Sequence, residues 1–289
     1  MKQVAITTDS NSGITQKEAG TLGISVLPMP FMMNGMLFYE EITLSQADFF
    51  ARLAAGASIS TSSPSVHDVT ELWDTLLNEY ESIVHIPMSA SLSSSCETAS
   101  VIAQEYEGRV QVVDNKRISV TQRQSVLDAL SLAGAGCSAI TIKQRLEQNS
   151  AESSIYIMVD TLTYLKKGGR ITSTAAAIGT VLNIKPVLQI QGGRLDAFAR
   201  VKGVKLSKRT MIDAMKKDFQ TRFAAACAAG EMELMVAYTY DEEAARIFRE
   251  EVIEAFPGYS IRMDPLSLSV SCHIGPGALA LACAKRQSI

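Results

Sequence analysis

The sequence predicts an α/β protein of two domains, the first with a mostly parallel sheet and the second with a mixed or antiparallel sheet. Three observations support this prediction. Short β-rich runs alternate with helical patterns through the first half, which favours parallel strands covered by helices. The pair Gly192-Gly193 separates two strand patterns in the second half and indicates an antiparallel hairpin. The chain of 289 residues is 47% hydrophobic, which is enough for two cores. We place the domains at 1–150 and 151–289, with an approximate boundary.

In the first half, helix caps and turn residues set the order of the elements. Thr15 and Ser45 occupy N-cap positions, and Asn34-Gly35 is a strong hairpin signal. The expected strands are 4–8, 24–29, the arms of a hairpin over 31–38, 82–87 and 110–113. One expected helix begins at 16, and the one that follows the loop 89–95 ends near 106. The other expected helices cover 46–55, 66–79, 118–133 and 140–147. Polar loops follow at 9–13, 60–65 and 89–95, where ligands of parallel sheets collect.

The second half begins with a strand and ends, by its apolar pattern, with a helix. The expected strands are 155–159, 186–190, 194–197, 232–238 and 259–265. The expected helices are 173–184, 207–228, 242–255 and 277–285. We expect the last of these helices to pack back at the domain interface.

Composition excludes several classes of function. The net charge is -3, from 27 basic and 30 acidic residues, so no basic excess exists for nucleic acid. The five cysteines form no C-x-x-C pair, and His67, His85 and His273 form no local metal motif. The chain opens directly on a strand pattern, and the one apolar run of membrane length, 265–284, contains a histidine and two prolines. We therefore expect a cytoplasmic protein without signal peptide, membrane span, metal or cofactor.

The segment 160–184 predicts an anion site beside an apolar surface. Gly168 and Gly169 allow a tight turn, and Arg170 precedes an expected helix start, where free N–H groups favour an anion. The helix that follows carries a set of apolar residues three and four apart, which is Ala175, Ile178, Gly179 and Leu182. An anion site beside such a surface suits a fatty acid. The alternative is an ordinary turn followed by a buried core helix.

Two hydroxyl-rich loops and one histidine are further candidates. Thr61-Ser-Ser-Pro-Ser65 and Ser89-Ala-Ser-Leu-Ser-Ser-Ser95 offer hydroxyls at helix starts, which can hold a carboxylate or simply cap the helix. His273 precedes Gly275 and Gly277 and could donate to an anion or serve as a structural histidine. The chain contains no G-x-G-x-x-G, Walker A or G-x-S-x-G motif.

These segments, in this order, resemble the DegV family of bacterial fatty-acid-binding proteins. The segment 160–171 follows the family pattern D-T-L-x-Y-L-K-K-G-G-R-I in full. The loop 61–65 is similar to the family's T-S-x-P-S, and Asp9-Ser10 to its opening strand-Asp-Ser. The segments 182–188 and 273–279 also match, so that the resemblance covers nearly the whole chain.

The resemblance implies a non-enzymatic protein that binds one long-chain fatty acid in a tunnel between two domains. Some members of that family are the binding subunit of a fatty acid kinase, whose separate kinase subunit phosphorylates the bound carboxylate, so the resemblance also points to such a partner. By position, Thr61 and Ser93 should hold the carboxylate, Arg170 and His273 should complete the polar network, and Ser62 and Ser94 are neighbours. We expect the apolar tunnel to be lined by Phe31, Met32, Ala175, Ile178, Gly179 and Leu182.

The chain departs from the family pattern at four positions. Ser91 and Ser94 replace glycines, Lys202 replaces a common arginine in a region linked to kinase docking, and Ala280 replaces a glycine. These changes put the kinase partner in more doubt than fatty acid binding. A competing interpretation is a small hydrolase or phosphotransferase that uses Asp9 or Ser93. A third is an interaction module that binds no ligand.

Overall fold

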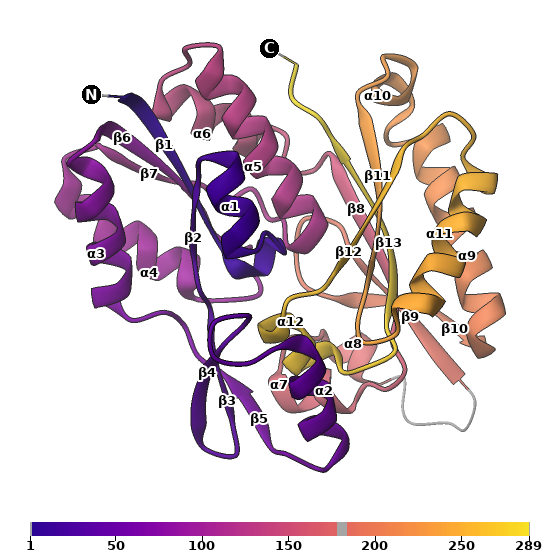
Figure 1. The fold of residues 1–289 in the computed structure, drawn as a ribbon. Helices are drawn as coiled ribbons and strands as arrows, with labels where there is room; N and C mark the ends of the chain where they lie inside the picture. Colours follow the sequence, from indigo (N-terminus) through magenta and orange to yellow (C-terminus); the bar gives the residue numbers. More distant parts are fainter. Residues whose placement is uncertain (1, 178–183, 289) are drawn as a thin grey trace.

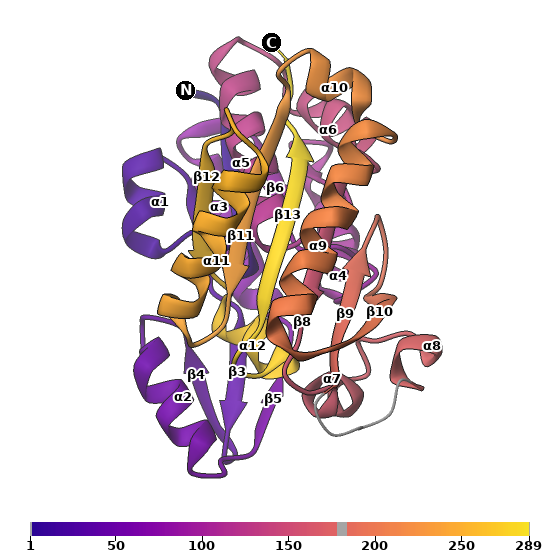
Figure 2. The same cartoon turned by 90° about the vertical axis from the view of Figure 1, so that its right-hand side faces the viewer.

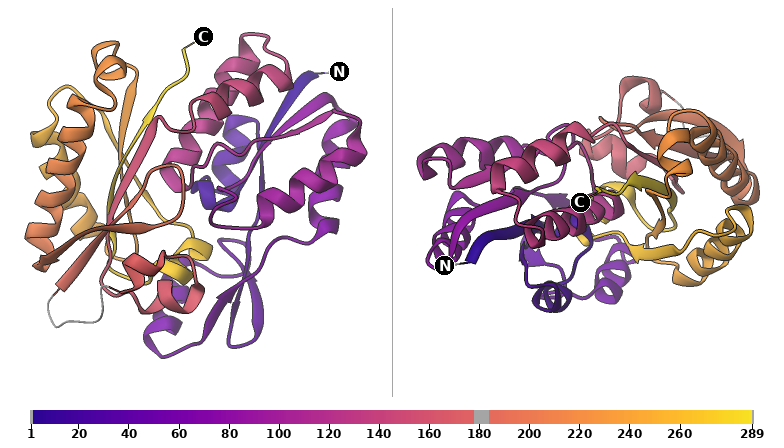
Figure 3. Two further views of the ribbon diagram at one scale, coloured as in Figure 1. Left: turned by 180° about the vertical axis from the view of Figure 1, so that it is seen from behind. Right: turned by 90° about the horizontal axis from the view of Figure 1, so that it is seen from above.

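The computed structural model describes residues 2–177 and 184–288, which form two α/β halves and a small third sheet (Figure 1). The two-domain α/β class is confirmed, because one sheet is parallel and the other is mixed. Seen from above, the two halves lie side by side (Figure 3). The domain boundary near residue 150 stays a prediction.

The first sheet is entirely parallel and has the order β2-β1-β6-β7. Its strands are β1 (Lys2–Asp9), β2 (Ser25–Leu27), β6 (Tyr80–Ile86) and β7 (Val110–Val112). One face packs on α3 (Val66–Leu77) and α4 (Ser95–Ile102), and the other on α1 (Gln16–Leu22), α5 (Ser119–Gly134) and α6 (Ala139–Gln148). The predicted caps are confirmed, since Thr15 accepts a hydrogen bond from the Glu18 N–H at the start of α1 and Ser45 accepts one from the Asp48 N–H. Helices on both faces leave the strand ends as the open edge of this sheet.

The second sheet is mixed and has the order β10-β9-β8-β13-β11-β12. Its strands are β8 (Ser153–Met158), β9 (Ile184–Ile190), β10 (Asp196–Lys202), β11 (Met232–Tyr238), β12 (Ile261–Pro265) and β13 (Leu279–Lys285). The predicted hairpin at Gly192-Gly193 is confirmed by the antiparallel pairing of β9 with β10. The outer face is covered by α9 (Gly203–Gln220), α10 (Ala224–Ala228) and α11 (Glu242–Ala255) (Figure 2). The inner face packs against α5 and α12 (Leu268–Ile274), so that it looks toward the first half.

The third sheet, of order β4-β3-β5, packs onto α12 from the side of the first half. It consists of β3 (Pro30–Met33), β4 (Met36–Tyr39) and β5 (Ile59–Thr61), with α2 (Gln46–Ala54) beside it. Phe31 shares one hydrophobic cluster with Leu268 and Cys272 of α12. The carboxyl group of Glu40 accepts hydrogen bonds from the Leu268 N–H at 2.8 Å and from Gln46 Nε2 at 2.8 Å. The small sheet is therefore fastened to the start of α12 by apolar and polar contacts.

The predicted closing helix over 277–285 is wrong. Residues Leu279–Lys285 form β13, which lies between β8 and β11 with antiparallel pairing on both sides. The run Leu-Ala-Leu-Ala-Cys-Ala consists of good helix formers, and only pairing with two neighbouring strands overrides that preference. The last helix is instead α12, so the expectation that a helix over 277–285 packs back at the domain interface is wrong as well.

Four further expectations differ from the structure. The predicted loop at 60–65 begins with the end of β5, and the predicted helix 207–228 is divided into α9 and α10. The segment 160–172 contains the short helix α7 (Thr163–Gly168), where only a turn was expected. The expected helix 173–184 is present as α8 (Ser173–Ala176), whereas Ile184 already belongs to β9. Residues 178–183 lie outside the described residues.

No helix in residues 2–177 and 184–288 is long and apolar enough to cross a membrane.

Candidate functional site

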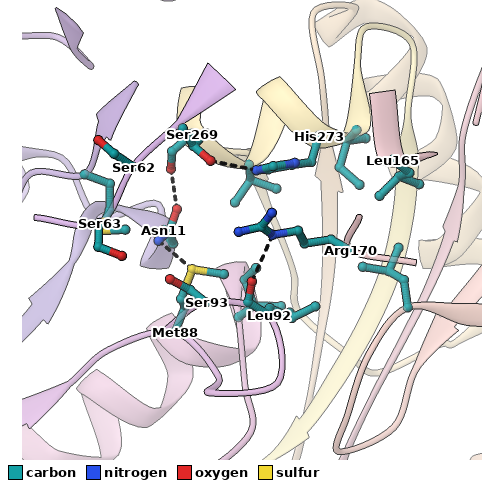
Figure 4. A pocket seen from close by; sticks show the side chains of 16 residues that line it. Asn11, Ser62, Ser63, Met88, Leu92, Ser93, Leu165, Arg170, Ser269 and His273 are labelled. Atoms are coloured by element: carbon teal, nitrogen blue, oxygen red, sulfur yellow. Dashed lines mark hydrogen bonds between the residues drawn. The ribbon is translucent and has the colours of Figure 1, made fainter. Parts of the chain in front are cut away.

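A polar pocket lies between the two halves, where α12 meets the loops that follow β1, β5 and β6 (Figure 4). Its cavity volume is about 90 Å³. Five of the six residues predicted to hold a carboxylate line this pocket, namely Thr61, Ser62, Ser93, Arg170 and His273. The sixth, Ser94, is exposed at the start of α4, with its Oγ 3.5 Å from the Ser63 Oγ. Their common role as a carboxylate site stays a prediction.

Thr61 and His273 join the two halves at the pocket. The Thr61 Oγ1 and the His273 Nε2 lie 3.0 Å apart in a hydrogen bond. Burial, and secondarily the positive charge of Arg170, lower the pKa of His273 to about 4. The imidazole is therefore neutral at neutral pH, and its Nδ1 has no hydrogen-bond partner among the described residues. At this point the pocket thus presents the Thr61 hydroxyl and a neutral imidazole beside the permanent cation of Arg170.

Arg170 is held at the pocket by backbone oxygens. Its Nε donates to the Leu92 carbonyl at 3.3 Å, and its Nη1 donates to the Gly168 carbonyl. Leu92 belongs to the loop after β6, so this contact also joins the two halves. The guanidinium has five N–H groups in a planar fork, and these two contacts leave most of them available to an anion.

Gly168 and Gly169 have different reasons to be glycine. Gly169 ends α7 with a φ of 69°, in the left-handed region that the sequence predicted. Gly168 does not have a positive φ, but a Cβ at this position would collide with the His273 imidazole. The Gly-Gly pair therefore ends a helix and also lets that helix approach His273.

An apolar cavity of about 40 Å³ adjoins the polar pocket. The two share four lining residues, Ile118, Leu195, Val270 and Ile274. The others lining the apolar cavity are Ser119, Val120, Ile155, Ile157, Ile190, Ala237, Leu266 and Ala280. Ser119 is the single polar residue among them, and the strands β8, β9, β11 and β13 all contribute. A polar opening and an apolar interior thus follow one another between the halves.

The residues predicted to line the acyl tunnel lie elsewhere or outside the description. Phe31 is fully buried in the small sheet, with its ring 5.5 Å from that of Phe49. Met32 is half-buried, and Ala175 is buried in the same hydrophobic cluster as the cavity walls. None of these three lines either cavity. Ile178, Gly179 and Leu182 fall outside the described residues, and the tunnel assignment of all six stays a prediction.

Sequence reasoning missed Asn11 and Ser269, which face the same pocket. The Asn11 Oδ1 accepts from the hydroxyls of Ser269 and, at 3.3 Å, of Ser267, while its Nδ2 donates to the Met88 Sδ at 2.9 Å. Asn11 lies in the polar loop 9–13, whose position beyond a strand end was a usable signal. Ser269 lies on α12, which the sequence pattern did not predict, so nothing pointed to it.

Asp9 is an internal support for these loops. It is 1% exposed, and its carboxylate accepts from the backbone N–H of Met88 at 2.8 Å and of Asn11 at 2.9 Å. The Gln122 Nε2 donates to the same carboxylate at 3.0 Å. Burial raises the pKa of Asp9, and these hydrogen bonds oppose the rise. Asp9 therefore ties the loop after β1 to the loop after β6.

A second polar cavity, called the outer cavity below, has a volume of about 160 Å³ and shares three lining side chains with the polar pocket. Thr61, Arg170 and His273 line both this outer cavity and the polar pocket. Lys167 and Ser60 line the outer cavity but do not line the polar pocket. Across the described part of the chain, no group of three or more His, Cys, Asp or Glu side chains could hold a metal ion.

Comparison with known proteins gives one consistent result. A family model described as an uncharacterised protein family, DegV, matches residues 3–286. A DegV domain-containing protein of Deinococcus radiodurans is 29% identical over 280 residues, which is 96% of this chain and 97% of that protein. The structure of a DegV family protein from Thermus thermophilus, described by its fatty acid binding, has a TM-score of 0.87 and 29% identity over 98% of this chain and 99% of that one. A stearic-acid-binding protein from Eubacterium ventriosum has a TM-score of 0.86 at 20% identity, over 98% of this chain and 99% of that one, which shows the shared fold.

Proposed function

The chain belongs to the DegV family, and from that membership together with the two adjoining cavities we propose that it binds one long-chain fatty acid. The carboxylate would lie in the polar pocket against Thr61, Ser93, Arg170 and His273, and the acyl chain would enter the apolar cavity. The observation that carries this proposal is that the two cavities adjoin, since both are lined by Ile118, Leu195, Val270 and Ile274. The fatty acid binding described for the Thermus thermophilus relative supports it.

The energetics of burial agree with a ligand of this kind. Removing an acyl chain from water contributes about 0.8 kcal/mol per methylene, so about a dozen methylenes contribute roughly 10 kcal/mol once the apolar cavity of about 40 Å³ widens to take them. Association and ordering cost on the order of 4 kcal/mol or more, which leaves a useful net affinity. The cation of Arg170 adds a charge-assisted hydrogen bond, which distinguishes an acid from a neutral lipid.

The competing hydrolase or phosphotransferase has little support in the geometry. Asp9 is buried and engaged with two backbone N–H groups and Gln122, so it cannot act as a nucleophile at the pocket. The Ser93 Oγ accepts a hydrogen bond from the Ser95 N–H at 3.2 Å, and no carboxylate or imidazole hydrogen-bonds to it among the described residues. A serine needs such a base to become a nucleophile.

Native mass spectrometry of the purified protein tests the main proposal. The expected result is one co-purified acid of about C14–C18 per chain, released on denaturation. Titration of delipidated protein with palmitate or oleate should then raise the melting temperature, because a ligand that binds the native state stabilises it. A clean unliganded mass together with no thermal shift would sink the proposal.

We further propose that the protein presents the bound carboxylate to a separate fatty acid kinase subunit, as the family resemblance implies. The outer cavity supports this proposal, because it is lined by Thr61, Arg170 and His273 but by none of the residues that line the apolar cavity. Lys167 there adds a positive charge, which favours an incoming phosphoryl group. The test mixes the loaded protein with a fatty acid kinase subunit and a nucleoside triphosphate and traps acyl phosphate with hydroxylamine. Hydroxamate should form only when all components are present, and its absence with a subunit that is active on another carrier would contradict the proposal.

A further inference from the structure

The polar pocket contains a second set of polar groups besides those assigned to the carboxylate. Asn11 and Ser269 both line it, and they are 2% and 6% exposed. Figure 4 shows the Asn11 amide and the Arg170 guanidinium on opposite sides of the pocket. A simple fatty acid has one polar end, whose oxygens would be bound by the first set under the proposed function. The second set therefore calls for a different explanation from the first.

The hydrogen bonds of Asn11 leave it with unused capacity toward the pocket. Its Oδ1 accepts from two serine hydroxyls, but its Nδ2 has only the Met88 thioether as acceptor, at 2.9 Å. A thioether sulfur is a weak acceptor, and the Nδ2 carries two N–H groups. The Ser269 Oγ, which donates to Asn11, keeps lone pairs that can accept. Together the two side chains offer one donor and one acceptor, which is the complement of an alcohol.

The spacing on α12 sets the place of this alcohol. Ser269 and His273 are four residues apart on α12, so they share one face and their Cα atoms are separated by roughly 6 Å along the axis. Val270 and Ile274 lie on the adjacent face, toward the apolar cavity. A carboxylate at His273 would thus have Asn11 and Ser269 beside the first few carbons of its chain.

We propose that the preferred ligand is a long-chain fatty acid with a hydroxyl near its carboxyl end, most simply a 3-hydroxy acid, whose hydroxyl is bound by Asn11 and Ser269. This inference rests on the proposed fatty acid binding and specifies its ligand class. An unsubstituted acid leaves the Asn11 N–H groups with the thioether alone, and buried polar groups without good partners disfavour a ligand.

The test compares the dissociation constants of palmitate and of each enantiomer of 3-hydroxypalmitate by calorimetric titration of the delipidated protein. The wild type should bind one enantiomer at least about fivefold more tightly than palmitate, the value of one added neutral hydrogen bond. Ser269→Ala should remove most of this preference and leave the affinity for palmitate within about twofold.

Ser271→Ala is the matched control, because Ser271 lies on the same helix, is fully buried and does not line the pocket. Its hydroxyl has no partner among the described residues, so both dissociation constants should stay as in the wild type. Equal affinities of the wild type for palmitate and for both hydroxy acids would overturn the inference while leaving fatty acid binding intact. A Ser269→Ala variant that weakens both acids equally would also overturn it, since the serine would then read the carboxylate. Failure of every acid to bind would overturn the proposed function and this inference with it.

Discussion

Gly168 lies directly against the imidazole of His273, with the ring in the place that a side chain at residue 168 would occupy. The contact joins α7 to α12, and with them the Lys-Lys-Gly-Gly-Arg segment to the pocket. A methyl group here would have to displace the ring, and with it the hydrogen bond to Thr61.

Gly168→Ala should therefore weaken fatty acid binding by about tenfold or more and destabilise the fold by about 1–3 kcal/mol, the usual effect of overpacking. Calorimetric titration and chemical denaturation measure the two effects. Gly193→Ala is the control, because nothing lies within 4 Å of a Cβ there and its φ is not in the left-handed region. Equal affinity of the Gly168→Ala variant and the wild type would show that His273 does not touch the ligand.

Arg170→Ala should weaken binding of palmitate more than Ser93→Ala does. A hydrogen bond to a charged group contributes about 1.5–3 kcal/mol, or roughly ten- to hundredfold in affinity, and a neutral one about 0.5–1.5 kcal/mol. Fluorescence competition against a labelled fatty acid would rank the variants. Arg194→Ala serves as the control, since Arg194 is exposed and lines neither cavity. The opposite order of the two losses would remove Arg170 from the head-group site.

Hexadecanol should bind less tightly than palmitate, because the alcohol has the same chain but no charge for Arg170. The difference should shrink in Arg170→Ala, where both ligands meet a neutral pocket. The same competition measurement on both proteins checks this. Equal affinity of the wild type for acid and alcohol would mean that charge plays no part in recognition.

The pKa of His273 should rise when a fatty acid binds. Without ligand it is lowered to about 4, mainly by burial. A carboxylate beside the ring favours the imidazolium and so moves the pKa upward. Titration of the imidazole NMR signals with and without palmitate measures the shift, and a His273→Gln spectrum assigns the signal among those of His67 and His85. A pKa that is the same in both titrations would contradict contact between ring and carboxylate.

Glu40 should make the protein less stable as the pH rises from about 4.5 to about 7. Burial raises its pKa from 4.5 to about 7, so in this window the folded protein holds a proton that the unfolded chain has released. The free energy of unfolding then falls with rising pH, and the loss is complete above pH 7. Glu40→Gln removes this dependence, so the variant should gain stability relative to the wild type between pH 5 and pH 8. Glu105→Gln is the control, because Glu105 is exposed. In chemical denaturation, its free energy of unfolding should differ from that of the wild type by the same amount at pH 5 and at pH 8.

The elements predicted well are those whose ends carry local signals. The parallel sheet, the Asn34-Gly35 hairpin and the capped starts of α1 and α2 follow from residues whose conformational preferences act over a few positions. β13 and α12 depend on distant partners instead. The alternation Leu268-Ser-Val-Ser-Cys272 has the period of a strand, yet it forms a helix between the small sheet and the pocket. Tertiary contacts decide the secondary structure of such segments, and a single sequence does not show those contacts.

The candidate site likewise combines residues that sequence motifs identify with residues that they do not. Thr61, Arg170 and His273 lie in recognisable motifs, so that their arrival at one pocket could be anticipated from the resemblance. The apolar cavity is assembled from single side chains of several strands and helices, such as Ile118, Ile155 and Ala280. Each of these looks like an ordinary core residue in its own segment. Which core residues border a cavity depends on how the two halves meet, and no short pattern encodes that.

The central position of β13 has a consequence for biosynthesis. This strand pairs with β8 and β11, but it is translated after both. A nascent chain that has reached residue 278 can form the hairpin of β9 with β10, yet the second sheet still has a gap at its centre. The wall of the apolar cavity contributed by Ala280 is also missing at that stage. Closing the gap requires pairing across 120 or more residues between β8 and β13, which makes it a slow, late event. Ribosome-bound chains should thus complete the proposed lipid site only when β13 emerges from the ribosome.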